Sequence, residues 1–418
     1  MAQLSDDCFA FGGPLMTIED AHALFGERLV AVVGTEDVPV QDADGRILAE
    51  DCVAPIDVPP FPNSAVDGYA VRFTDLRASD ATVLPVGAVV AAGGSSEGVS
   101  AAGSATRIFT GAPMPAEADT VFMQEDVHVL PDGRVSLPLG LKRGANSRDA
   151  GEDAAKGSSI IAAGRRLRPQ DLALATAVGL RTLKVRRTLR VGVFSTGNEL
   201  VEPGTPLRPG AIYDSNRVLL LALLRRMGVA ASDLGVIRDD PTALAARLSA
   251  AAAEHDVILT SGGVSTGDED HVKTAVETIG RLVFWRLGIK PGRPVAMGMI
   301  DGKPFLGLPG NPVAVYVTLL FVVRPLLARL AGEAYAPPRG FTARAGFSYR
   351  KRAGRREFVR VSLARDADGT WEVRKFQRDG AGMLSSLTET EGLVELEDNR
   401  TEVVPGDVVR FHPHEVLW

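Results

Sequence analysis

The segment "DVILTSGGVSTGDEDHVKTAVETIG", residues 256–280, joins three local patterns in a fixed order. Its first part is a continuous apolar run, which is typical of a strand buried on both faces. Its last part carries apolar residues at helical spacing and ends at Gly280. The loop between them is rich in Gly, Ser and Thr. A buried strand that leads through such a loop into a helix is the repeating unit of an α/β sheet.

The same unit recurs between residues 189 and 331. Continuous apolar strands that alternate with helices predict a parallel sheet covered on both faces. Ligands of such sheets bind at the carboxyl ends of the strands. The predicted strands are 189–196, 234–237, 256–263, 294–300 and 303–308, and the predicted helices are 215–228 (capped by Ser215), 240–255, 270–280 and 312–331.

The rest of the chain has other textures. Short β-branched runs cut by Gly, Pro and Asp fill 52–148, and alternating strands follow a Pro-Pro pair at 337–338. An amphipathic helix is predicted at 17–31, with Thr17 as its N-cap, and another helix at 168–180. We therefore expect a multidomain α/β plus β protein: a helical linker domain (1–51 plus 149–186), a β module (52–148), a doubly wound α/β domain (187–336) and a small C-terminal β-barrel (337–418).

Composition excludes several classes of protein. A net charge of −6 argues against a nucleic-acid-binding surface, although a local basic pocket stays possible. The 2 cysteines give no disulfide framework and no zinc pattern, which fits a reducing cytoplasm. The apolar run 313–323 is too short to span a bilayer, and no signal peptide is evident, so we expect no membrane association. We expect His412 and His414 to be surface residues.

Five loops leave the predicted strands at one edge of the sheet. Gly, Ser and Thr before a helix suit a phosphate, Lys and Arg would neutralise it, and separate carboxylates suit Mg²⁺ or ligand hydroxyls. Each loop alone is equally well explained as an ordinary turn, and only their convergence predicts a site for a phosphorylated ligand. The candidates are Glu199; Asp239; Gly262, Gly263, Ser265 and Asp270; Arg286, Lys290 and Arg293; and Pro309, Asn311 and Pro312.

A second group of turn-rich segments lies in the β module, at 59–72, 107–126 and 141–153. On composition alone these are surface turns. They gain a functional meaning only if the β module faces the crevice of the α/β domain, either within one chain or across a subunit boundary.

Nine short motifs occur in one order: "NSAVDGYA", "TGAPMP", "NSRDAGED", "STGNEL", "IYDSNR", "SGGVSTGDED", "IKPGRP", "GLPGNPV" and "GMLSS". With them the chain resembles the MoeA family of molybdopterin molybdenumtransferases, which is similar to the E domain of gephyrin. The resemblance covers nearly the whole chain, from about Leu15 to Val416.

The resemblance implies an enzyme that inserts molybdate into adenylylated molybdopterin, with Mg²⁺ and with release of AMP. It implies an elongated homodimer whose cleft lies between the α/β domain of one subunit and the β module of the other. A molybdopterin adenylyltransferase and molybdenum apoenzymes would be transient partners. Two alternatives remain: a non-catalytic molybdopterin-binding scaffold, and a molybdopterin adenylyltransferase, because the α/β domain is similar in both.

The resemblance also implies roles for individual residues. Asp67, Thr110, Glu199, Asp239 and Asp270 would be catalytic, with Asp239 and Asp270 as the Mg²⁺ ligands. Substrate would be bound by Asn63, Ser64, Arg148, Gly262, Gly263, Ser265, Arg286, Lys290, Arg293, Pro309, Asn311, Pro312 and Ser385, with Arg355 or Arg356 beside Ser385. The chain departs from the family pattern at Pro62, where Asp is common, and at Glu117, where Gly is usual. These two departures put the local loop shape in doubt.

Overall fold

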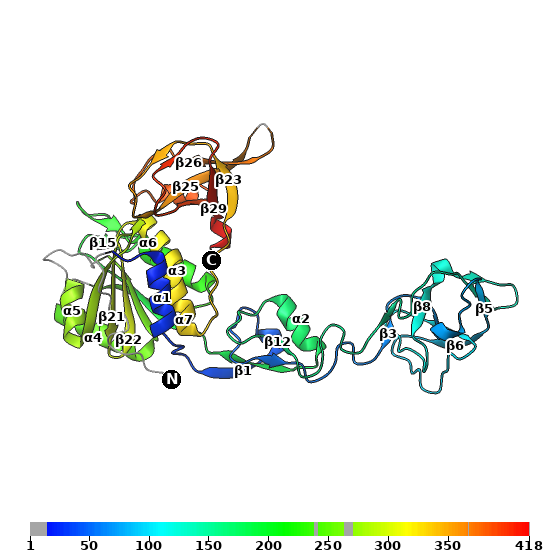
Figure 1. Cartoon of the computed structure of the whole chain (residues 1–418). Coiled ribbons are helices and arrows are strands. Elements are labelled where there is room, and N and C mark those ends of the chain that lie inside the picture. Colours follow the sequence, from blue (N-terminus) through cyan, green and yellow to red (C-terminus); the bar gives the residue numbers. More distant parts are fainter. Residues whose placement is uncertain (1–14, 238–240, 263–270, 367, 418) are drawn as a thin grey trace.

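The computed structural model describes residues 15–237, 241–262, 271–366 and 368–417, which form an elongated molecule (Figure 1). The α/β domain and the C-terminal barrel lie together at one end, and the β module lies at the other. A linker part joins the two ends. The predicted α/β domain, β module and C-terminal barrel thus correspond to separate parts of the molecule in Figure 1.

A six-stranded sheet forms the centre of the α/β domain, in the order β17-β14-β18-β22-β21-β19. Strands β14, β17, β18 and β22 are mutually parallel neighbours in this order. The strands are β14 (Arg190–Thr196), β17 (Ala230–Ile237), β18 (Val257–Ser261), β19 (Gly280–Arg286), β21 (Pro294–Ile300) and β22 (Lys303–Leu308).

The sheet is not parallel throughout, so that prediction was wrong for one strand. β21 runs antiparallel to both of its neighbours, β19 and β22. Ile300 pairs with Lys303, so only Asp301 and Gly302 connect β21 to β22, and both have positive φ, 47° and 74°. A two-residue Asp-Gly turn of this kind joins antiparallel strands. The Asp301-Gly302 dipeptide therefore indicates a β-hairpin, which the prediction of a wholly parallel sheet overlooked.

Helices cover both faces of the sheet, as predicted. Alternate residues of a strand enter different cores: Val193 packs in the core with α1, α3, α6 and α7, whereas Phe194 packs in the core with α4 and α5. The helices are α1 (Ile18–Arg28), α3 (Ser215–Arg226), α4 (Pro241–Glu254), α5 (His271–Ile279), α6 (Pro312–Thr318) and α7 (Arg324–Ala331).

Helix ends follow the sequence with one correction. Thr17 caps α1 through a capping box with Asp20, as expected. The N-cap of α3 is Asp214 and not Ser215, since the Asp214 carboxylate accepts from the Arg217 N–H at 3.2 Å. The predicted linker range includes α1, yet α1 packs its buried face into the core of the α/β domain. The domain boundaries themselves stay a prediction.

The predicted helix 312–331 is continuous but changes its winding. α6 and α7 are joined by a π-helical segment, Leu319–Val323. By length and composition this 20-residue stretch could cross a membrane, but 89% of its most apolar window is buried inside the protein. It is therefore a core helix of the α/β domain.

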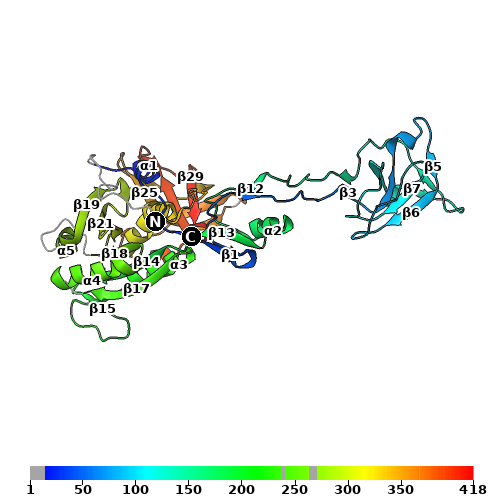
Figure 2. The ribbon, with the colours of Figure 1, turned by 90° about the horizontal axis from the view of Figure 1, so that it is seen from below.

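The linker part is mixed in structure. It contains one helix, α2 (Pro169–Ala177), and two small antiparallel pairs, β1 (Thr35–Pro39) with β13 (Thr182–Arg186) and β2 (Cys52–Val53) with β12 (Ser159–Ile161). Beyond it, two extended segments run side by side to the β module, joined at Val58 and Ala154 (Figure 2). The β module is thus held well away from the body of the same chain.

The β module consists of small sheets, as predicted. A four-stranded sheet has the order β6-β7-β4-β8, and a three-stranded sheet has the order β5-β10-β9. The strands are β3 (Asn63–Ser64), β4 (Gly68–Val71), β5 (Thr82–Leu84), β6 (Val86–Val90), β7 (Ala105–Ile108), β8 (Thr120–Met123), β9 (His128–Val129), β10 (Val135–Leu137) and β11 (Ser147–Arg148), with β3 paired to β11.

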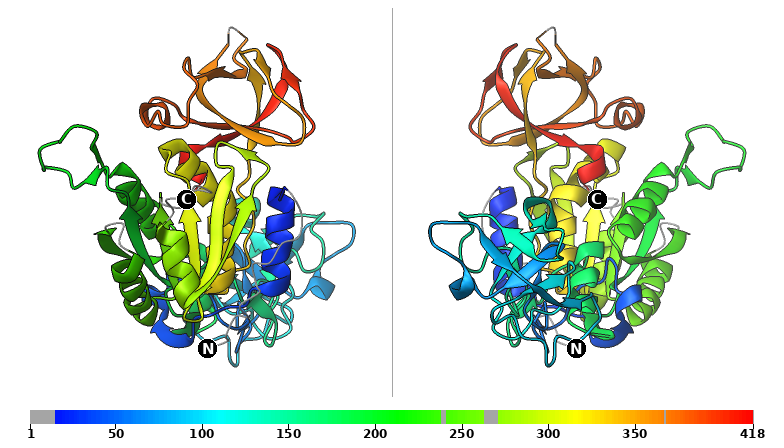
Figure 3. Two further views of the ribbon diagram at one scale, coloured as in Figure 1. Left: turned by 90° about the vertical axis from the view of Figure 1, so that its left-hand side faces the viewer. Right: turned by 90° about the vertical axis from the view of Figure 1, so that its right-hand side faces the viewer.

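The C-terminal part is the predicted small barrel. Its order is β25-β26-β23-β29-β27, and pairing of β27 with β25 closes it. Figure 3 shows the barrel seated over one end of the α/β sheet, to which β20 (Ile289–Lys290) joins it by pairing with β25. The barrel elements are β23 (Phe341–Ala345), β24 (Tyr349–Arg350), β25 (Arg356–Arg365), β26 (Trp371–Lys375), α8 (Ser385–Thr388), β27 (Gly392–Leu396), β28 (Glu402–Val403) and β29 (Val408–Pro413).

The two histidines of this region are not surface residues, so that prediction was wrong. His412 is 2% exposed and its Nε2 lies 2.8 Å from a Glu395 carboxylate oxygen. His414 is 9% exposed and its Nδ1 lies 2.7 Å from the hydroxyl of Tyr316 on α6. Both side chains form hydrogen bonds near the contact between the barrel and the α/β domain. The alternating pattern of polar and apolar residues in β29 alone does not predict such burial.

Candidate functional site

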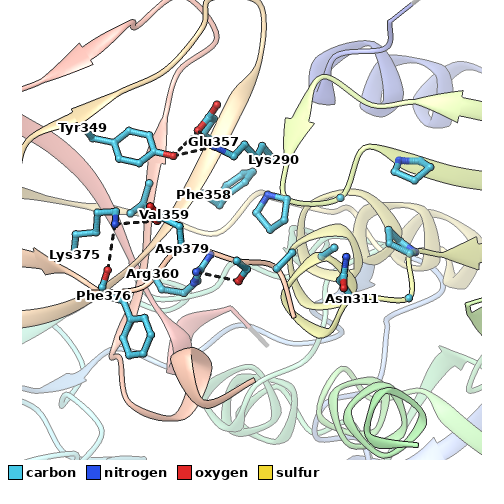
Figure 4. Close-up of a pocket in the computed structure, with 18 of the residues that line it drawn as sticks. Lys290, Asn311, Tyr349, Glu357, Phe358, Val359, Arg360, Lys375, Phe376 and Asp379 are labelled. Atoms are coloured by element: carbon cyan, nitrogen blue, oxygen red, sulfur yellow. Dashed lines mark hydrogen bonds and ion pairs between the residues drawn. The ribbon is translucent and has the colours of Figure 1, made fainter. Parts of the chain in front are cut away.

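A cavity of about 640 Å³ lies between the carboxyl edge of the α/β sheet and the barrel. Its floor comes from the loops that leave the strands, and its opposite wall comes from β25, β26 and the segment 379–381 (Figure 4). This volume is in the range of sites that bind small molecules and cofactors. The crevice therefore lies where the sequence predicts it, with a second wall that the barrel supplies.

The floor is built by close approach of three strand-end loops. Asn216 at the start of α3 donates from its side-chain amide to the Ser261 hydroxyl at 2.9 Å and to the Gly310 carbonyl at 2.7 Å. Gly262 has φ +84°, and a Cβ on Gly310 would lie 4.0 Å from the Gly262 Cα. Side-chain hydrogen bonds and small residues thus hold the ends of β18 and β22 together beneath the cavity.

Lys290 enters the cavity on a short segment between β19 and β21. Its ammonium donates to the Tyr349 hydroxyl and to the Glu357 carboxylate, each at 3.1 Å, and Tyr349 donates to the same carboxylate at 2.7 Å (Figure 4). Burial alone disfavours the charged ammonium, but these two hydrogen bonds outweigh it and raise the pKa of Lys290. Lys290 is therefore a fixed positive charge on the cavity wall.

Arg360 and Lys375 add two more cations from the barrel. Arg360 is only 8% exposed, and its guanidinium donates to the carbonyl of Gly380 at 3.2 Å. Its Nε is buried and has no hydrogen-bond partner among the described residues. Lys375 pairs with Asp379 at 2.9 Å, but that carboxylate is mostly exposed. That Nε is itself inaccessible, but the guanidinium lines the open cavity and forms no ion pair among the described residues, so its charge is suited to an anionic ligand.

The predicted residues of the α/β domain gather at this edge to different degrees. Five of them line the cavity: Glu199, Gly262, Lys290, Pro309 and Asn311. Four other predicted residues do not line the cavity. Pro312 is the first residue of α6, and Ser385 is exposed at the start of α8. Arg286 and Arg293 are exposed near the two ends of the Lys290 loop. The predicted residues Asp239, Gly263, Ser265 and Asp270 lie outside the described residues.

Gly197 explains how the Glu199 carboxylate is positioned. Gly197 has φ +147°, and a Cβ placed there would lie 2.5 Å from a Glu199 carboxylate oxygen. The backbone conformation favours glycine, and any side chain there would push the Glu199 carboxylate out of its observed position.

The predicted residues of the β module form a separate group. The Asp67 carboxylate accepts from the backbone N–H and from the hydroxyl of Thr110, both at 2.8 Å, and these hydrogen bonds lower the pKa of Asp67. Arg148 is exposed and lies opposite Asn63 in the β3–β11 pair. Asn63 and Ser64 are buried, and the Ser64 hydroxyl donates to the Val66 carbonyl, so these two residues shape the loop.

The two groups lie at opposite ends of one chain (Figures 1 and 2). The cavity of a single chain therefore receives no residue from the β module. If both groups serve one site, a second chain must bring the β module to the cavity.

The described residues hold no ready-made metal centre. No cluster of three His, Cys, Asp or Glu side chains suited to a metal ion occurs in the described ranges. Glu199 is the predicted acid that lines the cavity, while Asp239 and Asp270 lie outside the described residues. Carboxylates have the donor chemistry that Mg²⁺ prefers.

Several cavity residues escaped the sequence prediction: Tyr349, Glu357, Arg360, Lys375 and Asp379. The prediction favoured Arg355 or Arg356 instead. Arg355 pairs with Glu357, and Arg356 pairs with Asp398 and two glutamates. The available signal was the pair of charged residues, Glu357 and Arg360, in the run 357–361, whose other residues are apolar, because charged groups in such a run are buried only when they have partners.

Comparison with known proteins agrees with this architecture. Three family models match in order: the MoeA N-terminal region (domain I and II) over residues 16–179, a probable molybdopterin binding domain over 192–329, and the MoeA C-terminal region (domain IV) over 342–414. The chain is also similar to the crystal structure of a molybdopterin biosynthesis MoeA protein from Pyrococcus horikoshii OT3. The alignment covers 96% of this chain and 100% of that protein, with 29% identity and a TM-score of 0.80.

Two curated relatives cover nearly the whole length. A protein named molybdopterin molybdenumtransferase from Haemophilus influenzae is 38% identical over 404 residues, which are 96% of this chain and 100% of the relative. One of the same name from a Nostoc species is 35% identical over 94% of this chain and 92% of the relative. With all three family regions present in order, the chain belongs to the MoeA family of molybdenum cofactor biosynthesis proteins.

Proposed function

We propose that this protein is a transferase of molybdenum cofactor biosynthesis that inserts molybdenum into molybdopterin at the cavity between the sheet and the barrel. The observation that carries the proposal is the buried Arg360, whose guanidinium lines the cavity without an ion pair among the described residues, with Lys290 and Lys375 beside it. Molybdate is a tetrahedral dianion, and several convergent cations bind such an ion well. The names of the curated relatives support the same activity.

The substrate form and the metal are finer parts of the proposal. We infer that the substrate is adenylylated molybdopterin, that AMP is released, and that Mg²⁺ is held by Asp239 and Asp270 with Glu199 at the rim. When bound, the metal would neutralise charge on the adenylyl phosphate. The protein acts in the cytoplasm, with a molybdopterin adenylyltransferase and molybdenum apoenzymes as transient partners.

The cavity residues would bind molybdate and hold it for the exchange of its ligands. Lys290, Arg360 and Lys375 bind molybdate and offset its two negative charges, and Glu357 and Tyr349 keep Lys290 charged and in place. The two dithiolene sulfurs form bonds to molybdenum while one oxygen of molybdate leaves. That oxygen takes the two thiol protons and departs as water, so atoms and charge balance. The contribution of the protein is positioning and charge neutralisation.

The site would be completed by a second copy of the chain. Asp67, Thr110 and Arg148 lie far from the cavity of their own chain, so we infer a homodimer in which each β module reaches the cavity of its partner. This arrangement gives a role to the polar turns of the β module.

The test supplies the purified full chain with adenylylated molybdopterin, molybdate and Mg²⁺, and measures AMP release and reconstitution of a molybdenum apoenzyme. Substitution Arg360→Gln removes one cation, and we expect the molybdate concentration for half-maximal rate to rise about tenfold or more. Arg365→Gln, five residues along the same strand and exposed, is the matched control and should leave the rate unchanged.

Two results would contradict the proposal. One is a wild-type chain that forms no molybdate-dependent product. The other is an Arg360→Gln variant whose molybdate dependence matches that of the wild type. Formation of adenylylated molybdopterin from ATP would favour the adenylyltransferase alternative instead.

A further inference from the structure

A second pocket lies on the other side of the α/β domain, where the linker part joins it. Its volume is about 220 Å³, and its wall includes residues that immediately precede β14 and β17, Leu189 and Val229. It is therefore at the amino edge of the sheet, while the candidate active site is at the carboxyl edge. β14 has 7 residues, so the two sites are separated by about 20 Å of sheet.

Six arginines line this small pocket together with a single glutamate, Glu333. They come from segments far apart in the sequence: Arg46, Arg166, Arg186, Arg187, Arg226 and Arg324. Mutual repulsion of so many guanidinium groups is unfavourable unless counter-charges lie among them.

Part of this group has a structural explanation. Arg166 forms an ion pair with Glu333 and donates to the Gly45 carbonyl at 2.8 Å. Arg46 pairs with the partly exposed Glu36, and Arg324 donates to the Leu417 carbonyl at 2.6 Å. These bonds tie the linker and the C-terminal end of the chain to the α/β domain.

Arg186 and Arg187 have no such explanation. In the described ranges neither Arg186 nor Arg187 forms an ion pair, and Arg187 is exposed. The Nε of Arg186 is buried and finds no hydrogen-bond partner among the described residues. That Nε faces the Gly332 backbone, so the donors that a ligand could use are the other guanidinium nitrogens of Arg186 and the guanidinium of the exposed Arg187.

Two glycines show that the arginines are closely fitted. A Cβ on Gly228 would lie 2.7 Å from Nη1 of Arg166, and a Cβ on Gly332 would lie 2.9 Å from Nε of Arg186. Both glycines end helices with positive φ, 73° and 79°. Gly228 and Gly332, which follow α3 and α7, therefore also leave room for guanidinium groups at the pocket wall.

We propose that this pocket is a binding site for a small, multiply charged oxyanion that carries phosphoryl groups. Guanidinium groups recognise phosphoryl oxygens through paired N–H donors. The volume lies below the roughly 300–1,000 Å³ of sites for drug-sized ligands, which favours one or two phosphoryl groups over a whole nucleotide. A bound anion bridges the linker to the α/β domain and so fixes the direction in which the distal β module extends.

The test uses pyrophosphate and isothermal titration of the full-length chain. The cationic cavity at the carboxyl edge can also bind pyrophosphate, so the titrations are made in an Arg360→Gln background. There we expect one binding event per chain, weakened about a hundredfold by Arg186→Gln with Arg187→Gln, or about tenfold for each lost cation. Arg225→Gln is the matched control, because Arg225 is exposed on the same α3 as Arg226 but does not line the pocket.

A second variant guards against loss of folding. Arg187→Lys keeps the charge and loses the paired donors, and we expect it to weaken pyrophosphate binding several-fold with an unchanged melting temperature. The proposal is overturned if the background chain binds no pyrophosphate, or if the Arg186→Gln, Arg187→Gln chain binds it as tightly as the Arg225→Gln chain. Tighter binding of ATP than of pyrophosphate would overturn the assignment to a small anion.

Discussion

Single residues carry the strongest link between sequence and site. Gly197 adopts φ +147°, which favours glycine, and a Cβ there would displace the Glu199 carboxylate. Lys290 keeps its charge because Tyr349 and Glu357, about sixty residues away in sequence, accept its hydrogen bonds. The first constraint is local and is legible in "TGNE", whereas the second exists only when the barrel packs over the sheet.

Glu117 shows what a departure from the family pattern costs. The residue stands where the resemblance leads us to expect glycine, and it has φ +68°. Its side chain makes only a long, exposed ion pair with Arg72, at 3.4 Å. A left-handed conformation costs a residue with a Cβ about 1 kcal/mol, which this ion pair does not offset.

We therefore predict that Glu117→Gly stabilises the β module. Relief of about 1 kcal/mol of strain should raise the melting temperature of a module of this size by about 4 °C, measured by calorimetry. Glu117→Gln keeps the strained backbone and should bring no gain. An equal rise for both substitutions would show that charge, and not backbone conformation, limits stability there.

At the scale of elements, the long core helix shows how one residue reshapes its neighbours. Pro325 lies in the first turn of α7 and has no N–H to donate to the Phe321 carbonyl four residues earlier. Phe321 lies within the π-helical segment, and its carbonyl oxygen lies 2.9 Å from Nε2 of His22 on α1. Pro325 removes a hydrogen bond within the helix, and the Phe321 carbonyl instead contacts His22 on the neighbouring helix α1.

The contact between α6 and the end of the barrel depends on a neutral histidine. The Thr390 hydroxyl donates to the Ser386 carbonyl at 2.6 Å, so it accepts from Nε2 of His414, which leaves Nδ1 to accept from Tyr316. Burial disfavours the imidazolium and lowers the pKa of His414 to about 4, although the Glu391 carboxylate opposes this shift. In the unfolded chain the pKa of histidine is about 6.5.

We predict that stability falls as the pH decreases from about 6.5 to about 4. In this window the unfolded chain binds a proton that folded His414 does not, so acid favours unfolding, by up to about 3 kcal/mol. Urea unfolding at pH 7.5, 5.5 and 4.5 would measure the effect. His414→Gln should be less stable at pH 7.5 but should lose less stability toward pH 4.5. The exposed His128→Gln control should follow the wild type, and an identical slope for all three would contradict this role of His414.

At the scale of the whole molecule, the tether decides how the site is shared. Two antiparallel segments hold the β module far from the cavity of its own chain (Figure 2). Asp67 and Lys290 therefore cannot serve one site within a single chain of this shape. They can do so in a symmetric dimer, which would contain two equivalent sites.

Subunit mixing tests this arrangement. Asp67→Ala and Lys290→Ala chains with different tags are co-expressed, and the mixed dimer is isolated by both tags. Each homodimer should be inactive, while the mixed dimer has one intact site and should show about half the wild-type activity. A mixed dimer as inactive as its parents would mean that both residues act within one chain.

The sequence by itself determined the elements of this protein and the edge at which they present polar loops. Caps such as Thr17, apolar periods and turn formers act over a few residues, so they can be read without a structure. They were sufficient for the helix-covered sheet, the β module and the barrel, and for placing Glu199, Lys290 and Asn311 at one crevice.

Only the tertiary structure decided which of these parts meet. It reversed β21, buried His412 and His414, and brought Arg360 and Lys375 of the barrel to Lys290. It also gathered six arginines from distant segments into one pocket. Such contacts depend on packing between segments tens to hundreds of residues apart, and no local pattern of charge or hydrophobicity encodes the distance between them.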